Sequence, residues 1–378
     1  MISEVVIVHR HLTHYRVPLF ELLRTLLRAD GVNLRLLHGG PTPEERSKRD
    51  QGRVEWAEHL PTHYFLGGRV CWQAFGSGTV KSDLVIITQE NRLIYNLWAL
   101  LVRRLHRHPR RIAFWGHGAN LQATHPDSWR ERYKRALIGK VDWWFAYTRR
   151  SVDLVHGAGF PAERITDLEN AIDTRGLAEQ CAAVTSQELD EARARLGLAG
   201  KRVALYLGSL YEEKRLPFLL EACERVVQKV PSFCLLVSGE GPQRAMIEQA
   251  ARDKPWLRYL GMQKGRDKAI ALRLAEMMLN PGLVGLGILD SFTAGIPLVT
   301  TDCKVHSPEI AYLQSGENGL MTVNSLDAYC AAILSLLRNE PERRRLGINA
   351  QSVAARYTIE NMAQRFRAGI LKALQTKA

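Results

Sequence analysis

Short apolar runs alternate with amphipathic helical patterns along this chain. Runs such as Val5–Val8 and Phe233–Ser238 have the length and composition of buried strands, and stretches such as Pro18–Arg28 and Pro217–Val230 place apolar residues at helical spacing. The full set of predicted strands is Val5–Val8, Asn33–Leu37, Leu84–Thr88, Ile112–Trp115, Trp143–Tyr147, Val203–Leu207, Phe233–Ser238, Leu257–Leu260, Met277–Leu279 and Leu298–Thr301. Helices that separate buried strands predict a doubly wound α/β fold.

The length of the chain, 378 residues, favours two such domains, because it exceeds what one hydrophobic core usually sustains. The polar segment Thr174–Lys201 contains no strand pattern and separates two series of α/β units. We therefore expect an N-terminal domain over 1–175 and a C-terminal domain over 176–358. We expect a last helix within 359–378, and one arrangement for it is to pack back onto the N-terminal domain.

The charge of the chain points to an anionic substrate or surface. The net charge is +13, and residues 1–175 contain 26 Lys and Arg against 18 Asp and Glu. Net charge alone does not choose among nucleic acid, acidic lipid and a phosphorylated substrate. The six scattered cysteines include no Cys-x-x-Cys pair and predict reduced thiols in a cytosolic protein. No apolar run reaches the length of a membrane span, so we expect any membrane contact to be peripheral.

A glycine-rich loop leads directly into a short apolar helix near residue 280. Gly282, Gly285 and Gly287 allow a ligand to approach the backbone, and Gly295 and Pro297 end the helix. The N–H groups and the positive dipole end at the start of a helix attract anions. The segment therefore predicts a phosphate site that suits a sugar-nucleotide diphosphate, although a simple tight turn is the alternative.

Four motifs follow one another in the second half of the chain: Gly208–Lys214, Ser238–Pro242, Val284–Asp290 and Ala294–Pro297. In this order and spacing they resemble the C-terminal domain of family 4 glycosyltransferases, the glycosyl transferases group 1. Weaker matches lie in the first half, at His14–Pro18, Trp115–Gly118 and Glu169–Asp173, so the resemblance spans most of the chain. It implies the GT-B fold, with two Rossmann-like domains facing across a cleft, and a retaining transfer of sugar from a nucleotide diphosphate.

The resemblance also implies the roles of individual residues. Lys214, Asp290 and His117 would be the catalytic residues: Lys214 beside the diphosphate, Asp290 on the ribose hydroxyls, and His117 on the donor sugar. The remaining donor-binding residues would be Ser209, Gly282, Leu283, Val284, Gly285, Leu286 and Glu309, and the acceptor or phosphates would meet His14 and Arg16. Each has an alternative: a solvated lysine, a satisfied structural aspartate, a structural histidine, a helix-terminal carboxylate at Glu309, or a helix cap at His14.

Three positions depart from the usual pattern of this family. Ser209 stands where an Arg usually shares the diphosphate with the Lys, and Gly282 replaces a Glu that usually touches the donor sugar. Asp290 replaces the second Glu with a shorter carboxylate. We then expect Lys214, helix dipoles and a neighbouring Arg to stabilise the negative charge of the leaving group. We expect no metal, since the sequence has no Asp-x-Asp pair and no ligand spacing of Cys and His, and no cofactor beyond the donor substrate.

An apolar stretch that contains Trp98 ends in a cluster of arginines within Leu97–Arg111, and Trp129–Arg135 repeats this chemistry. Such segments lie on anionic bilayers. The alternative is that the leucines face the core and the arginines are solvated. We expect no nucleic-acid partner, and we place the protein in the cytoplasm, peripheral at the inner face of the plasma membrane.

Three functions remain open on this basis. The favoured one is a metal-independent retaining hexosyltransferase that acts on a glycan or lipid-linked acceptor in cell-surface polysaccharide or glycolipid synthesis. The second is a GT-B epimerase, which the loss of a carboxylate at Gly282 disfavours. The third is a non-catalytic nucleotide-sugar-binding or scaffold protein, which Ser209 and Gly282 together favour.

Overall fold

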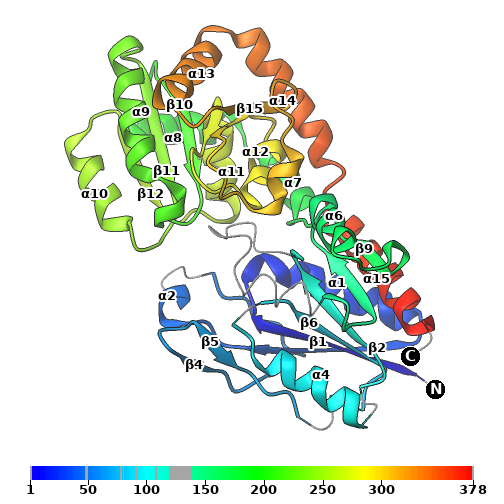
Figure 1. Ribbon diagram of the computed structural model, residues 1–378. Helices are drawn as coiled ribbons and strands as arrows, with labels where there is room; N and C mark the ends of the chain where they lie inside the picture. Colours follow the sequence, from blue (N-terminus) through cyan, green and yellow to red (C-terminus); the bar gives the residue numbers. More distant parts are fainter. Residues whose placement is uncertain are drawn as a thin grey trace. The chain divides into compact units, whose positions relative to one another are not determined.

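The protein is described by a computed structural model, which covers residues 2–376 apart from 47–49, 77, 78, 80, 91, 107, 108 and 119–137. The chain forms two compact units (Figure 1). Unit 1 comprises Met1–Asn170 together with Ile359–Ala378, and unit 2 comprises Ala171–Thr358. The first division thus lies slightly before the expected boundary at 175, and the segment 359–378 belongs to unit 1.

Unit 1 contains a seven-stranded parallel sheet in the order β3-β2-β1-β6-β7-β8-β9. Its strands are β1 (Ser3–His11), β2 (Val32–Gly39), β3 (Glu58–His59), β6 (Leu84–Thr88), β7 (Ile112–Gly116), β8 (Trp143–Ala146) and β9 (Ile165–Asp167). A separate antiparallel hairpin is formed by β4 (His63–Phe65) and β5 (Val70–Trp72). The sequence pattern did not predict this hairpin, β3 or β9, since each of these strands is too short to show a period of two residues.

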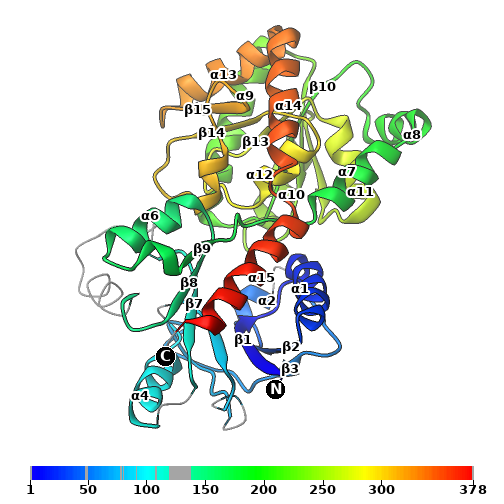
Figure 2. The same ribbon diagram turned by 90° about the vertical axis from the view of Figure 1, so that its right-hand side faces the viewer.

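The helices of unit 1 cover the sheet. They are α1 (Val17–Ala29), α2 (Pro43–Arg46), α4 (Tyr95–His106), α6 (Arg149–Gly157) and α15 (Ile359–Gln375), with 3-10 helices η1 (His14–Arg16) and η2 (Ala162–Arg164). Figure 2 shows α15 beside α1, and its apolar side chains also meet β8 and β9. The segment Trp129–Arg135, which the sequence analysis compares with Leu97–Arg111, lies outside the described residues.

Unit 2 contains a six-stranded parallel sheet in the order β12-β11-β10-β13-β14-β15. Its strands are β10 (Arg202–Leu207), β11 (Phe233–Ser238), β12 (Leu257–Gly261), β13 (Met277–Leu279), β14 (Leu298–Thr301) and β15 (Gly319–Thr322). Its helices are α7 (Thr174–Ala183), α8 (Ser186–Leu196), η3 (Glu212–Lys214), α9 (Leu216–Lys229), α10 (Arg244–Asp253), α11 (Gly265–Leu274), α12 (Gly287–Thr293), η4 (Pro308–Tyr312), α13 (Leu326–Arg338) and α14 (Glu340–Ala354).

The polar segment Thr174–Lys201, which contains the predicted domain boundary, belongs to unit 2. It forms α7 and α8, which pack against α11 as part of unit 2. Thr185 and Glu188 form a reciprocal capping box at the start of α8, and Arg266 pairs with Glu188 at 2.5 Å. The capping and the ion pair anchor a helix whose exposed face is polar, which explains the polar composition of the segment.

In both sheets the strand order reverses beside the first strand, between β1 and β6 and between β10 and β13. The predicted pair of parallel α/β units is therefore confirmed. In open sheets of this kind, ligands bind outside the carboxyl ends of the strands at such a reversal. The loops that follow β1, β6, β10 and β13 are thus the places where a site is expected.

Candidate functional site

The structure brings two predicted motifs together at the strand-order reversal of unit 2. The loop Gly208–Lys214 follows β10, and the glycine-rich loop 280–286 follows β13. Lys214 Nζ donates a hydrogen bond to the carbonyl of Leu283 at 2.6 Å, and the Leu283 amide donates to the carbonyl of Glu213 at 2.8 Å. The predicted phosphate-binding lysine and the predicted phosphate-binding loop therefore belong to one site.

Gly282 has a steric reason to be glycine. A Cβ atom at this position would lie 2.3 Å from the Glu213 carbonyl oxygen and 2.4 Å from the carbonyl carbon of Lys214. Both contacts are with backbone, which has little freedom to move aside. No side chain fits here while the loop packs on η3, so the carboxylate that the resemblance leads us to expect at this position has no equivalent at Gly282.

A third loop, Ser238–Pro242, is joined to the loop after β10. The Leu210 amide donates to the Glu240 carbonyl at 2.8 Å, and a Cβ atom on Gly239 would lie 1.8 Å from the Gly208 carbonyl oxygen. Ser209, in the loop after β10, is partly exposed, and its carbonyl accepts a hydrogen bond from the Tyr206 hydroxyl at 2.8 Å. The glycines of this motif thus allow three loops to meet at the carboxyl edge of the sheet.

Arg215 is the neighbouring cation of this site. It adopts a left-handed backbone conformation, with φ of 56°, between η3 and α9. Its guanidinium donates to the Asn324 side chain at 2.7 Å, to Thr301 Oγ1 at 3.1 Å and to the Pro281 carbonyl at 3.3 Å. Arg215 therefore holds the glycine-rich loop at Pro281, a role that only the fold reveals.

Asp290 lies in α12 and is paired within unit 2. Its carboxylate accepts a hydrogen bond from Lys268 Nζ of α11 at 2.6 Å, and the side chains of the pair are 11% and 24% exposed. The sequence raised a ribose and a structural partner as alternatives for this carboxylate. The structure supplies the structural partner, Lys268, which sequence analysis missed because it lies 22 residues away on another helix.

His306 holds the backbone of the glycine-rich loop in place. The Val284 amide donates to His306 Nδ1 at 3.1 Å, so His306 Nε2 carries the proton that it donates to the Thr301 carbonyl at 2.7 Å. The Ser307 amide in turn donates to the Val284 carbonyl at 3.0 Å. Glu309, predicted near the donor sugar, is buried in the first turn of η4. Sequence analysis did not single out His306, although it lies three residues before Glu309 in the same segment.

His117 lies where the sequence predicts it, immediately after β7 at the carboxyl edge of the sheet of unit 1. Its ring is partly exposed and packs on the Tyr147 ring with centroids 4.5 Å apart. Gly116 before it approaches Gln89, and Gly118 after it has a φ of 78° and approaches Val155. These close contacts fix the backbone on both sides of the histidine.

The two predicted acceptor residues differ in exposure. His14 is exposed in η1, with its Nδ1 3.1 Å from the Asp50 carbonyl. Arg16 is buried, donates to the Asn170 side chain at 2.7 Å, and lies over the rings of Trp115 and Tyr147. Arg16 therefore stabilises the interior of unit 1, and a role in acceptor binding stays a prediction.

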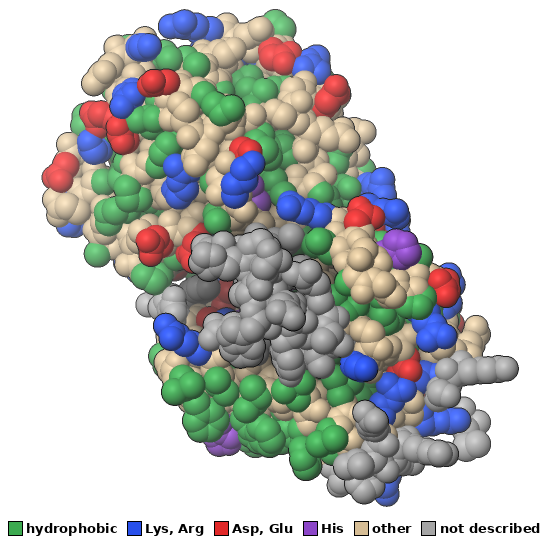
Figure 3. Space-filling model, viewed as in Figure 1, with side chains coloured by type: hydrophobic (Ala, Val, Ile, Leu, Met, Phe, Trp, Pro, Cys, Tyr) green, Lys and Arg blue, Asp and Glu red, His purple; other side chains and the backbone are tan. Residues whose placement is uncertain are grey.

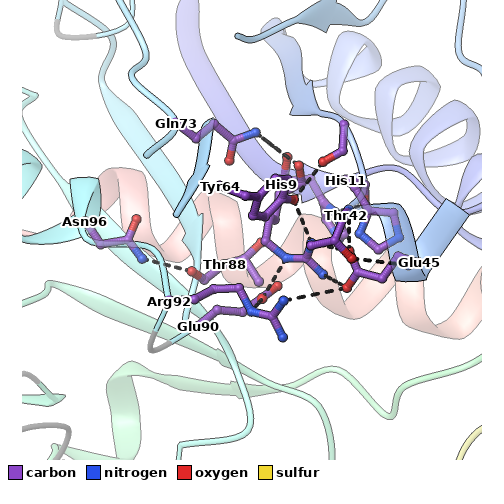
Figure 4. Close-up of polar contacts among 12 residues, drawn as sticks. His9, His11, Thr42, Glu45, Tyr64, Gln73, Thr88, Glu90, Arg92 and Asn96 are labelled. Atoms are coloured by element: carbon purple, nitrogen blue, oxygen red, sulfur yellow. Dashed lines mark hydrogen bonds and ion pairs between the residues drawn. The ribbon is translucent and has the colours of Figure 1, made fainter. Parts of the chain in front are cut away.

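A buried cluster of charges at the strand-order reversal of unit 1 escaped the sequence analysis. Arg10, at the end of β1, pairs with Glu45 of α2 at 2.6 Å and with Glu90, just after β6, at 2.7 Å. The Tyr64 hydroxyl accepts a further hydrogen bond from Arg10 at 2.9 Å, and Arg92 lies 3.4 Å from Glu90. Figure 4 shows Glu90 and Arg92 beside Glu45. A charged residue two positions after the end of each of two predicted strands was the available signal.

Opposing effects act on the titration of this cluster. Burial alone would raise the pKa of Glu45, but hydrogen bonds from Arg10 and the Thr42 amide hold that pKa at about 2. Burial lowers the pKa of the Arg10 guanidinium, and Glu90 and Glu45 more than reverse this, so the net pKa is raised. Burial, with Arg10 next, lowers the pKa of His11. Glu45 and Arg10 therefore stay ionised at neutral pH, beside a neutral His11.

The comparisons with known proteins agree with this arrangement. Residues 201–339 match the family described as glycosyl transferases group 1. Phosphatidyl-myo-inositol mannosyltransferase of Mycobacterium tuberculosis is 31% identical over 169 residues, which are 42% of this chain and 43% of that protein. Alpha-D-kanosaminyltransferase of Streptomyces kanamyceticus is 25% identical over 187 residues, 47% of each chain. The chain thus matches less than half the length of either relative.

The likeness to solved structures extends over both units. Anabaena Alr3699/HepE, solved in complex with UDP and glucose, superimposes with a TM-score of 0.71 at 13% identity, covering 98% of this chain and 100% of that one. At this identity the likeness concerns the fold. Residues 201–339 are thus similar to the glycosyl transferases group 1, and the two Rossmann-like units have the fold of GT-B glycosyltransferases.

Proposed function

We propose that the protein is a metal-independent retaining hexosyltransferase. It transfers a sugar from a nucleotide diphosphate to a glycan or lipid-linked acceptor at the cytoplasmic face of the membrane, in cell-surface polysaccharide or glycolipid synthesis. The observation that carries this proposal is the junction of Lys214 with the Leu283 carbonyl at the strand-order reversal of unit 2. The mannosyltransferase relative, whose name specifies a phosphatidyl-myo-inositol acceptor, supports the lipid-linked acceptor.

In this mechanism the donor diphosphate binds at the loops after β10 and β13. Lys214 is 8% exposed, and its ammonium is held at the loop, so it offers a positive charge without a large cost in side-chain ordering. Cleavage of the bond between the sugar and the diphosphate leaves negative charge on the phosphate oxygens. Lys214 and the amides of the glycine-rich loop stabilise that charge as it develops.

His117 and Asp290 complete the proposed set. His117 hydrogen-bonds the donor sugar, and Asp290, which is paired with Lys268, accepts a hydrogen bond from a hydroxyl of the ribose. Retention arises from attack of the acceptor hydroxyl on the same face from which the diphosphate leaves. The acceptor proton passes to the leaving phosphate, so this step needs no protein nucleophile.

Calorimetric titration of UDP and of GDP in the presence of EDTA tests the donor site. Binding of at least one nucleotide is expected. Binding that appears only with added Mg²⁺ or Mn²⁺ would refute metal independence, and no binding at all would refute the site.

Transfer assays then separate the proposal from its alternative, a non-catalytic nucleotide-sugar-binding protein that Ser209 and Gly282 favour. The assay offers labelled UDP-, GDP- and dTDP-sugars with a membrane lipid extract in EDTA. Labelled glycolipid or glycan is the expected product. Nucleotide binding without transfer from any donor would favour the scaffold, and a changed sugar without transfer would favour an epimerase.

A further inference from the structure

The exposed hydrophobic side chains of this protein are concentrated on one part of unit 1. In the described part of the chain, ten large hydrophobic side chains are exposed, and seven of them lie on the β4–β5 hairpin, immediately before α4 or along α4. They are Phe65, Leu66, Trp72, Ile94, Leu97, Trp98 and Leu101, which we call the apolar patch. Figure 3 shows hydrophobic side chains gathered over these elements.

The hairpin presents apolar residues outward because its two faces differ. Tyr64 and Cys71 form one cross-strand pair and face inward, where the Tyr64 hydroxyl meets Arg10. The neighbouring pairs place Phe65 and Trp72 on the opposite face. At the tip, Leu66 is 77% exposed and has a φ of 51°, a left-handed conformation that is costly for leucine. A strained, exposed leucine at a hairpin tip suits an insertion into an apolar phase.

Helix α4 adds a second apolar stripe to the same surface. Ile94, Leu97, Trp98 and Leu101 follow the spacing of one helical face and are exposed, whereas Ala99 contacts the core of unit 1. The hairpin and the start of α4 are joined: the Cys71 amide donates to the Arg92 carbonyl at 2.6 Å, and the rings of Trp72 and Tyr95 lie 4.9 Å apart. The two stripes therefore form one continuous patch.

The charge of the two segments selects the occupant. Residues 59–82 and 91–126 contain eight Lys and Arg and no Asp or Glu. Three of these arginines pair with acidic residues outside the two segments: Arg92 with Glu90, Arg103 with Asp142 and Arg110 with Asp83. The same surface on a second copy would bring like charges together, which disfavours a symmetric dimer through the patch. Aromatic and aliphatic side chains beside arginines fit the interface of an anionic bilayer. None of the described helices is long and apolar enough to span a bilayer, so the contact would be made at the surface.

Not every arginine of Leu97–Arg111 is available for that contact. Arg103 pairs with Asp142 at 2.6 Å, and Arg111 is buried and donates to the Thr376 carbonyl. The described part of the structure does not include the Arg104 side chain, Arg107 or Trp129–Arg135. Arg69, beside the tip of the hairpin, and Lys81 are exposed. These two cations, rather than Arg103, are the residues to change in a test of lipid attraction.

We propose that the apolar patch is the surface through which the protein docks on an anionic bilayer, with the hairpin tip and the outer face of α4 inserted among the headgroups. This docking proposal depends on the proposed function in one respect: docking would give the enzyme access to a membrane-borne acceptor.

Vesicle co-sedimentation of the full chain tests the proposal. Wild type is expected to bind vesicles of phosphatidylcholine with phosphatidylglycerol, and to bind phosphatidylcholine alone weakly. Phe65→Ser with Leu66→Ser, or Leu97→Ser with Trp98→Ser, should lower the affinity by about tenfold or more, since each buried apolar side chain contributes strongly. Arg69→Glu with Lys81→Glu should weaken binding and reduce its dependence on salt. All these side chains are exposed, so melting temperatures should stay unchanged.

Matched controls come from unit 2, where Ile348 is 68% exposed and Val323 is 70% exposed. Ile348→Ser with Val323→Ser, and Arg338→Glu for charge, should leave vesicle binding intact. Equal loss in the controls, no binding by the wild type, or unchanged binding by the patch variants would overturn the proposal. Sedimentation velocity tests whether the patch is instead an interface between two copies of the chain. A wild-type dimer that dissociates in the patch variants, while their vesicle binding is unchanged, would also overturn the proposal. Nucleotide binding in the same variants reports separately on the donor site.

Discussion

At the scale of single residues, glycines and buried charges decide the geometry of both strand-order reversals. Gly282 allows the glycine-rich loop to pack on η3, where the Leu283 carbonyl meets Lys214. Arg10 ties β1 to Glu45 and Glu90 in the interior of unit 1. These residues act through backbone contacts and charge rather than through large apolar area.

Gly282→Ala is expected to displace the loop from η3, because its Cβ atom meets backbone at 2.3 Å. The cost in stability should be about 1–3 kcal/mol, the usual range for overpacking. Nucleotide affinity, measured by calorimetry, should fall as well. Gly285→Ala is the control for stability, since its nearest contact would be the Ser307 side chain at 3.5 Å. Equal effects of the two substitutions would argue against the steric role of Gly282.

Lys214→Ala and His117→Ala should separate donor binding from turnover. Loss of a charge-assisted hydrogen bond to phosphate should weaken nucleotide binding by about 1.5–3 kcal/mol in Lys214→Ala. His117 belongs to unit 1, so His117→Ala should leave nucleotide affinity intact and reduce kcat. Titration calorimetry and steady-state kinetics measure the two effects. If both variants keep wild-type kinetics, the assigned site is wrong.

The stability of unit 1 should depend on pH through Glu45. Its pKa in the folded state is about 2, below its usual value of 4.5. A carboxyl with a depressed folded pKa contributes stability above pH 4.5, and this contribution is lost as pH falls towards 2. Glu45→Gln should therefore cost most near neutral pH, about 3 kcal/mol at the upper limit, with a smaller deficit in acid.

Urea denaturation across this pH range measures the difference. Glu58→Gln is the control, because Glu58 forms a surface pair with Arg35, and such pairs contribute at most about 1 kcal/mol. A deficit in Glu45→Gln that is independent of pH would show that the ion pair does not control the titration.

At the scale of elements, α15 completes unit 1 although it is the last helix of the chain. Its buried residues Met362, Phe366 and Ile370 follow helical spacing and pack on unit 1. Arg367 pairs with Asp30 beyond the end of α1 at 2.5 Å, and Gly369 approaches Thr166 and Phe145 closely. The first and last segments of the sequence are therefore parts of one core.

Phe366→Ala should destabilise unit 1 by about 3–5 kcal/mol, as expected for an aromatic side chain removed from a core. Phe366 meets Trp115 and Phe145, with ring centroids 5.1 and 4.6 Å apart. Hydrogen exchange followed by mass spectrometry should show faster exchange in β7 and β8 and unchanged exchange in β10 and β11. Lys372→Ala, at an exposed site of the same helix, is the control. Uniform loss of protection in both units would mean that they unfold together.

At the scale of the whole molecule, donor chemistry is assigned to unit 2 and the bilayer contact to unit 1. Each unit has its own parallel sheet and its own buried core. The two proposed functions can therefore be measured one at a time in the full chain.

UDP or GDP in EDTA should protect amide hydrogens in the loops 208–215 and 280–290 of unit 2. The physical reason is that a ligand which binds only the native state suppresses local opening in proportion to its occupancy. The apolar patch of unit 1 should show no protection by nucleotide, and it should gain protection with anionic vesicles. Protection by nucleotide confined to other segments would move the donor site elsewhere.

The sequence by itself determined the parallel α/β plan, most strand positions and the motifs of the donor site. These features are written in local periodicity, in glycine spacing and in motif order, which neighbouring residues encode. Leu84–Thr88 and Phe233–Ser238, for example, are strands with the predicted bounds.

Tertiary structure alone decided which distant groups meet. The Lys268 partner of Asp290, the Glu45 and Glu90 partners of Arg10, and the contact that excludes a side chain at Gly282 all join residues far apart in the chain. The pattern of Leu97–Arg111 allowed α4 to face either the core or a membrane, and the fold exposes Leu97, Trp98 and Leu101. Helical spacing determines which residues share a face of a helix. Only the packing of the other elements determines whether that face contacts the core or solvent.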